Sequence, residues 1–297
     1  MVVKIVFLAH RVEFLEMFDE EVRNSSTVIL EEPENNMLKN FLNNSLSIDE
    51  YLRVIDTNFP LYSKHQLELL KKWHREGKTI IQAEPYLETI AYINSAIIAR
   101  RYDECLKNEA IRNVIELERK TVKALIEYQE ALMEKDFDLI VEKVIEFAKM
   151  DAERFKVRDY MRAEKISKIV NDERVVVEAG YMHIMLPRYL RKLKIDTVEV
   201  NLLEKACRRI GMKFLEAPGD ILTKAFIEEK NLGGLEKLLA AQSLIYISLL
   251  SKEEKAPTKW EPFPHLKEEL QIIENISKMN YEKCRETFYK LWSKTQK

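Results

Sequence analysis

Histidine and glutamate side chains follow four short apolar runs of the sequence. His10 ends VFLAH, Glu31 and Glu32 follow VIL, Glu84 ends IIQAE, and His183 comes shortly after VVVEAG. Imidazole and carboxylate groups transfer protons, orient water molecules and bind divalent metal ions. Any one of these residues is most simply an ordinary residue at the end of a strand, but their repeated placement indicates a shared site.

The apolar runs that carry these residues have the composition of β-strands. They are short, rich in valine and isoleucine, and bounded by polar or turn-forming residues: 2–9, 26–32, 78–84 and 174–180, with 197–203 as a weaker fifth. Amphipathic segments such as RVEFLEMFDEEVRN lie between them. This alternation predicts an α/β fold with a small, mainly parallel sheet, in which ligands bind at the carboxyl ends of the strands.

A large helical insertion is expected between the third and fourth strands. The segment from Tyr86 to Ala179 contains no glycine and no proline and consists mainly of residues that favour helices. We predict an α/β domain over residues 1–210, with a helical lobe inserted at about 86–170. Additional C-terminal helices form a region over 211–297 that we expect to pack on this domain.

One helix of the insertion, AERFKVRDYMRAEKISKIV, carries a second set of polar residues. Helical spacing places Asp159 on the apolar stripe that begins at Phe155, so this carboxylate faces inward and requires a partner. Arg154, Arg158 and Arg162 recur at every fourth position and are the obvious local supply of partners. They either form a buried ion pair that holds the helix to the sheet, or place a guanidinium group in the pocket, where it stabilises negative charge.

The charge of the chain and its apolar segments limit its partners. Its 297 residues include 48 basic and 50 acidic side chains, so no excess of positive charge is present to neutralise a nucleic acid backbone. The most apolar later segment, LEKLLAAQSLIYISLL, is shorter than the roughly 20 residues of a membrane-spanning helix. We therefore expect neither nucleic acid nor a membrane as a partner.

The cysteines and the N-terminal run indicate a cytoplasmic protein. Cys105, Cys207 and Cys284 are widely spaced and form no paired motif, which favours a reducing compartment. The first apolar run contains a lysine and lacks a small-residue cleavage site, so it is typical of a strand rather than of a signal peptide. The abundance of charged residues and the presence of only six glycines suggest a heat-adapted protein.

Four short patches, taken in order, resemble the superfamily of TraB, Tiki, ChaN and the erythromycin esterases. TraB-like sequences have a strand ending in Gly-x-x-His, a second ending in Val-x-x-Glu, a helix with Arg-Asp-x-x-Met, and a later strand ending in Gly-x-x-His. The corresponding segments here are Phe7–His10, Val28–Glu31, Arg158–Met161 and Gly180–His183. The resemblance covers roughly residues 1–195, and the order and spacing of the patches give it its specificity.

This resemblance implies a hydrolase-like pocket over the sheet, with Tiki-like metal-dependent peptide cleavage and ChaN-like haem binding as precedents. His10, Glu31 and His183 are ligands suited to zinc, manganese or cobalt, and three ligands leave positions open for water. A divalent metal is favoured over haem. Without a metal, the same residues would act as general base and orienting carboxylate, with Arg158 stabilising developing negative charge.

We predict a cytoplasmic hydrolase, with or without a divalent metal, that cleaves a peptide, amide or ester bond of a peptide or small molecule. The expected catalytic residues are His10, Glu31, Arg158, Asp159 and His183. The expected substrate-binding residues are Glu84, Gly180 and Arg154. A homodimer is the expectation from base rates.

The alternative is a non-catalytic protein that binds a ligand, such as haem or a metal, or that serves as a scaffold. Phe7 and Leu8 are its best support, because they place apolar bulk where the related families keep glycine and glutamate. Whether the protein is an enzyme is therefore left open by the sequence.

Overall fold

The structure, a computed structural model, describes residues 2–55, 57–170 and 174–295. It divides into two compact units, each built from three stretches of the chain. The first, the sheet unit, comprises the chain up to Glu88 with Arg158–Phe214 and Glu253–Leu266. The second, the helical unit, comprises Thr89–Val157, Leu215–Lys252 and Lys267–Lys297.

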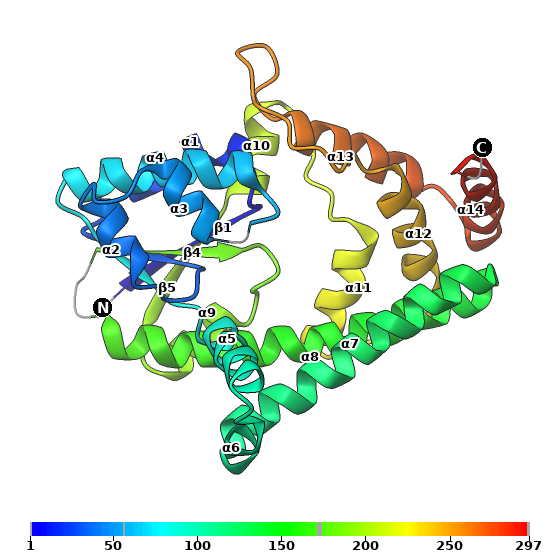
Figure 1. Cartoon of the computed structure of the whole chain (residues 1–297). Coiled ribbons are helices and arrows are strands. Elements are labelled where there is room, and N and C mark those ends of the chain that lie inside the picture. Colours follow the sequence, from blue (N-terminus) through cyan, green and yellow to red (C-terminus); the bar gives the residue numbers. More distant parts are fainter. Residues whose placement is uncertain (1, 56, 171–173, 296–297) are drawn as a thin grey trace. The chain divides into compact units, whose positions relative to one another are not determined.

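The sheet unit contains a five-stranded parallel sheet in the order β3-β2-β4-β1-β5. Its strands β1, β4 and β5 are labelled in Figure 1. Its strands are β1 Val2–Leu8, β2 Thr27–Leu30, β3 Thr79–Gln82, β4 Val175–Gly180 and β5 Asp196–Asn201. All four predicted strands and the weaker fifth are present, which confirms the expected α/β fold.

The two adjacent strands β1 and β4 form the buried centre of the sheet. Their sequences are almost continuously apolar because both faces of the sheet are covered. The exceptions are Lys4 in β1, which is paired with Glu21, and Glu178 in β4. Glu178 is a buried carboxyl group that lies opposite Val6 of β1. At the ends of the strands Leu8 lies opposite Gly180, so the segments leading to His10 and His183 leave the sheet at the same edge.

Within the sheet unit, the strands are connected by η1 Val12–Phe14, α1 Leu15–Val22, α2 Met37–Leu42, α3 Ile48–Val54, α4 Pro60–Arg75 and α9 Leu186–Lys192. The helix α10 Leu202–Arg209 follows the last strand, β5. Local capping sets where several of them begin. Ser47 starts α3 by a reciprocal pair of hydrogen bonds with Glu50, and the Asn201 side chain accepts backbone N–H groups at the start of α10.

The predicted insertion between β3 and β4 consists of four helices joined by short turns. They are α5 Pro85–Ile98, α6 Tyr102–Lys107, α7 Glu109–Glu134 and α8 Phe137–Ile169. Four further helices follow β5 and α10: α11 Pro218–Ile227, α12 Glu236–Leu249, α13 Pro264–Ile276 and α14 Tyr281–Thr295. Three of the boundaries between the units fall inside α5, α8 and α13, and the other two fall in the segments between α10 and α11 and between α12 and α13.

The helical unit has a hydrophobic cluster of its own. Its buried members include Phe137, Ile140, Leu222, Ala241 and Ile245. In the part of the chain that the structure describes, no helix is both long enough and apolar enough to span a membrane.

Candidate active site

Each of the four strand ends predicted to carry chemistry lies in the sheet unit. His10 follows β1, Glu31 follows β2 directly, Glu84 follows β3, and His183 follows β4. Glu31 contacts His183 directly, and Arg158 links Glu31 to Glu84. The carboxyl edge of the sheet therefore brings the predicted residues together, as expected for a parallel sheet.

Glu31 is the centre of this group. Its Oε1 atom lies 2.7 Å from His183 Nε2 and 3.3 Å from Arg158 Nη2, while Oε2 lies 3.4 Å from Arg162 Nη1. Burial would raise the pKa of Glu31, but the charges of His183 and Arg162 hold this pKa well below its usual value. Glu31 is therefore a carboxylate held among three cations.

Gly180, predicted to bind substrate, supports Glu31 instead. Its backbone N–H donates a hydrogen bond of 2.5 Å to Glu31 Oε2. A Cβ atom built at this position would lie 3.4 Å from Glu31 Oε2 and 3.5 Å from His183 Cδ2, which are ordinary contact distances. The N–H group, rather than the absence of a side chain, is what this position contributes to the site.

His183 is enclosed by two carboxylates. Its Nδ1 atom is hydrogen-bonded to Asp159, its Nε2 atom to Glu31, and its side chain is only 2% exposed. Burial lowers the pKa of His183, but the two carboxylates outweigh this effect and raise the pKa to about 9. The ring is therefore an imidazolium at neutral pH, with both nitrogen atoms acting as donors.

Asp159 faces inward, as its helical position predicts, and is fully buried. Its Oδ2 atom accepts the backbone N–H groups of Met185 and Leu186, at 3.0 and 3.1 Å, where α9 begins. Unpaired N–H groups at a helix start favour an anion in this position. Asp159 thus connects α8 to α9 and orients the His183 ring between them.

Two arginines of α8 hold this helix to the strand ends. Arg158 Nε lies 3.4 Å from Glu84 Oε1. Arg162 is completely buried and donates to the carbonyl oxygens of Ala83, at 2.9 Å, and Glu178, at 2.5 Å. These contacts support a buried ion pair that holds the helix to the sheet, rather than a guanidinium group placed in the pocket. Arg162, which was not among the predicted site residues, belongs to this ion pair.

Two residues predicted to bind substrate are occupied elsewhere. Glu84 has no exposed surface, and its carboxylate faces Arg158 and Arg162. Arg154 belongs to the helical unit, where its guanidinium group lies 2.5 Å from Asp151 and 4.0 Å from Glu118. Neither side chain is presented to a ligand in this arrangement.

A cavity of about 410 Å³ lies at the same edge of the sheet. It is lined by His10, Glu31, Glu32, Pro33, Asn35, Ile55, Thr57, Phe59, Tyr62, Ser63, Gln66, Gln82 and Glu178. A volume of this size accommodates a small molecule or the reacting part of a larger one. His10 and Glu31 are the predicted site residues that reach its wall, and several other polar residues join them there.

Glu178 is the most important residue that sequence reasoning missed. It accepts hydrogen bonds from the Tyr62 hydroxyl at 2.9 Å, the Gln66 amide at 3.2 Å and the Glu31 backbone N–H at 3.2 Å. Its Oε1 atom is also 3.9 Å from His10 Nε2, which makes it the carboxylate partner of that histidine. The signal was present in the sequence, because a glutamate within the apolar run VVVEAG requires a buried polar partner.

Glu32 provides a group that titrates in the physiological range. Burial, reinforced by the charge of Glu178, raises the pKa of Glu32 to about 7. The Gln82 side chain donates a hydrogen bond of 2.8 Å to Glu32 Oε2, which fixes the carboxyl group at the cavity wall. Glu32 therefore exists in both protonation states near neutral pH.

An uncharacterized protein of Archaeoglobus fulgidus is 37% identical to this chain over 292 residues, which cover 98% of this chain and 99% of the relative. The chain belongs to the family of this archaeal protein. The alignment spans both the sheet unit and the helical unit, so both are features of the archaeal family. No family model and no solved structure matches, and the similarity to TraB-like proteins therefore stays a prediction.

Two of the three predicted metal ligands, Glu31 and His183, contact each other. Both nitrogen atoms of His183 are hydrogen-bonded to carboxylates, whereas a metal ligand requires a free imidazole lone pair. Among the residues that the structure describes, no three histidine, cysteine, aspartate or glutamate side chains are grouped to hold an ion. A divalent metal bound by His10, Glu31 and His183 stays a prediction.

Proposed function

We propose that this protein is a hydrolase that cleaves a peptide, amide or ester bond in the 410 Å³ cavity. One observation carries the proposal: an imidazole, His10, and a carboxyl group with a pKa of about 7, Glu32, line the same cavity. A base and an acid that face one space are the minimum equipment for hydrolysis by acid–base catalysis.

His10 is the general base in this proposal. A water molecule in the cavity gives a proton to the His10 ring as its oxygen attacks the carbonyl carbon of the substrate. Glu178, 3.9 Å from His10 Nε2, stabilises the imidazolium that forms. Tyr62, Gln66 and the Glu31 N–H hold Glu178 in place, so the histidine meets a fixed negative charge.

Glu32 is the general acid. In its protonated form it gives a proton to the leaving nitrogen or oxygen as the carbon–heteroatom bond breaks. The products are a carboxylic acid and an amine or alcohol. His10 then holds the proton taken from water and Glu32 lacks one, and solvent exchange returns both groups to their starting states.

The buried ions behind the cavity wall have a positioning role. Glu31 lines the cavity, and its charge would oppose the negative charge that develops on the substrate. His183, Arg158 and Arg162 neutralise that charge from the protein side. Arg158, predicted to stabilise the reacting group directly, acts in this proposal as a counter-ion of Glu31.

The test is hydrolysis of a panel of aryl esters, aryl amides and mixed peptides by the wild type and two variants. We expect His10→Ala to lower kcat/KM about 100-fold or more, which is the usual contribution of a general base. In the wild type, activity should fall as pH rises through about 7, because Glu32 loses the proton that it donates. Glu32→Gln should lack this fall and should have a lower maximal rate.

The matched controls are His65→Ala and Glu68→Gln, which alter an exposed pair on α4 in the same unit. Both controls should retain wild-type kinetics. Equal hydrolysis rates in His10→Ala, Glu32→Gln and the controls would show that the cavity is not the catalytic centre.

A non-catalytic ligand-binding or scaffold protein is the second candidate. It is favoured by Phe7 and Leu8, which are buried core residues of β1 and contribute no polar group to the cavity. It also fits the complete pairing of His183 within the protein. If the wild type hydrolyses no member of the panel but binds haemin or Zn²⁺, and His10→Ala abolishes this binding, the second candidate replaces the first.

A further inference from the structure

A second cavity, about 680 Å³ in volume, runs along the edge strand β3. The backbone N–H groups of Thr79 and Ala83 donate to the carbonyl oxygens of Ser26 and Leu30 beside β2. Because alternate residues of a parallel strand direct their polar backbone groups to opposite sides, those of Ile80 face the other way, along the open edge. The cavity, here named the β3 groove, follows that edge.

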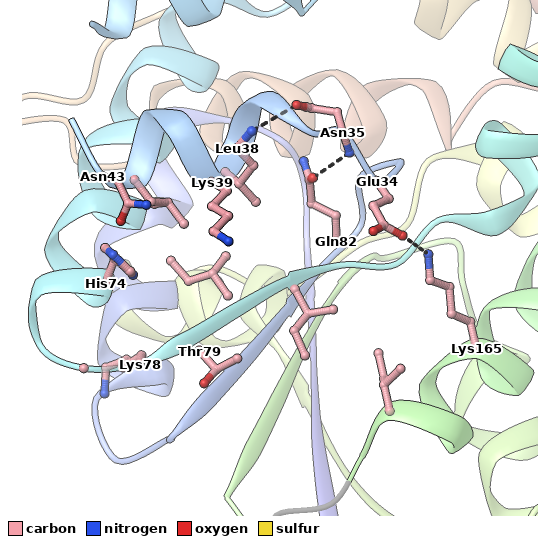
Figure 2. Close-up of a pocket in the computed structure, with 15 residues that line it drawn as sticks. Glu34, Asn35, Leu38, Lys39, Asn43, His74, Lys78, Thr79, Gln82 and Lys165 are labelled. Carbon is pink, nitrogen blue, oxygen red and sulfur yellow. Dashed lines mark hydrogen bonds and ion pairs between the residues drawn. The ribbon is translucent and has the colours of Figure 1, made fainter. Parts of the chain in front are cut away.

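Apolar side chains and two lysines form the walls of the β3 groove. Leu38 of α2, Ile81 of β3 and Ile169 of α8 provide apolar surface. Figure 2 shows Lys39 extending from α2 toward β3, and Lys165 entering from α8 at the other end. A surface with backbone groups along one side and apolar walls is suited to an extended peptide.

The charges of the groove favour an acidic ligand. Lys165 lies 3.4 Å from Glu34 and 2.8 Å from Glu88, so two carboxylates already balance its charge. Lys78 also lines the groove, but it is buried and its ammonium group donates to backbone carbonyl oxygens of the preceding loop. Lys39 is exposed and is the positive charge that the groove presents to a ligand.

The β3 groove borders the proposed catalytic cavity. Asn35 and Gln82 line both spaces. The Asn35 backbone N–H donates to Gln82 Oε1 at 3.0 Å, as Figure 2 shows, and Gln82 Nε2 donates to Glu32 at 2.8 Å. A chain seated along β3 would therefore reach, at the carboxyl end of that strand, a residue that contacts Glu32.

We propose that the β3 groove binds an extended peptide with acidic side chains, which adds to the sheet as a new strand beside β3. Main-chain hydrogen bonds to the open edge hold the peptide, and Lys39 selects acidic side chains on it. Such peptides are then the substrate class of the enzyme, a statement that rests on the proposed function, whereas the binding itself does not.

The binding test uses a fluorescein-labelled peptide of about eight residues that alternates threonine and glutamate, long enough to span β3 at roughly 3.3 Å per residue. Fluorescence anisotropy measures its Kd for the full-length protein. We expect Lys39→Glu to raise this Kd about tenfold, because it reverses a charge that faces the acidic peptide. Lys64→Glu, at an exposed site on α4 outside the groove, is the matched control and should leave the Kd unchanged.

Methylation of the peptide backbone tests strand addition itself. Two versions of the peptide carry N-methyl groups at the odd or at the even positions. Since only alternate N–H groups of an added strand face β3, one version should bind at least about tenfold more weakly and the other within about twofold of the parent peptide. Equal effects of the two patterns, or no difference between Lys39→Glu and Lys64→Glu, would overturn the proposal. The lysines would then serve to keep the sheet edge free of other strands.

The binding result separates this inference from the proposed function. Binding with the expected pattern but without cleavage supports the peptide site and contradicts the proposal that the bound peptide is a substrate. His10-dependent hydrolysis of the panel, with no binding of the acidic peptide, overturns the peptide site and leaves the proposed function intact.

Discussion

The charge of His183 in the folded protein differs from that of a free histidine at neutral pH. Two carboxylates hold its ring as an imidazolium, and these contacts exist only in the folded protein. The residue that most resembles a catalyst in the sequence is therefore a fixed positive charge. In the proposed function, the groups that act on the substrate are instead His10 and Glu32, at the cavity wall.

The charge of His183 should make stability depend on pH. Its pKa rises from 6.5 to about 9 on folding, so the folded protein retains a proton that the unfolded chain releases. The stabilisation is complete below pH 6.5 and is lost as pH rises through about 9. We expect the free energy of unfolding to fall by about 3 kcal/mol across this range in the wild type.

Denaturant unfolding of His183→Gln measured at several pH values checks this expectation. The variant should be less stable than the wild type below pH 6.5, and the alkaline loss should be absent. His65→Gln, which alters an exposed histidine on α4, should show the wild-type profile. A His183→Gln profile parallel to that of the wild type would show that His183 does not carry this charge.

At the scale of elements, α8 is the helix that organises the site. Its residues Arg158, Asp159 and Arg162 bind the ends of β2, β3 and β4 or the loops that follow them. The parallel strands bring the polar groups to one edge, and the helix adds the compensating charges. Edge strand β3 then leaves one side of the sheet open to a further strand.

Arg162 should be the most sensitive position on this helix. Arg162→Met would leave the carbonyl oxygens of Ala83 and Glu178 and the carboxylate of Glu31 without this partner. Removing one member of a buried ion pair usually destabilises by about 3–5 kcal/mol, and we expect a loss of that size in the free energy of unfolding.

The control for this substitution is Arg191→Met, because Arg191 forms an exposed ion pair with Glu199 in the same unit. It should change stability by less than about 1 kcal/mol. Similar losses in Arg162→Met and Arg191→Met would contradict the assigned role of Arg162.

At the scale of the whole molecule, the chain forms two units with separate hydrophobic clusters. Ile5 belongs to the cluster of the sheet unit and Ile245 to that of the helical unit, and both are fully buried. Each cluster is closed mainly by residues of its own unit, although the chain passes between the units several times. The similarity to the archaeal relative extends over both units.

We expect differential scanning calorimetry to resolve two unfolding transitions, one for each cluster. Ile5→Ala and Ile245→Ala should each destabilise one unit by about 2–5 kcal/mol and lower the temperature of a different transition. A single transition that both variants lower equally would show that the units unfold as one.

Much of the fold was predictable because its signals are local. Short apolar runs predicted all five strands, and a long segment free of glycine and proline predicted the helical insertion. The convergence of Glu31, Glu84 and His183 followed from the geometry of a parallel sheet and was also predictable. The gathering of polar residues at the carboxyl edge was thus determined by the sequence alone.

The roles of those residues were decided by tertiary structure. Whether His183 ligates, catalyses or carries a fixed charge depends on the positions of Asp159 and Glu31, which are far from each other in the sequence. Tyr62 and Glu178 are likewise separated by 116 residues and meet only in the folded chain. The pKa of an ionisable group depends on charges within a few ångströms and on its burial, and spacing along a sequence determines neither.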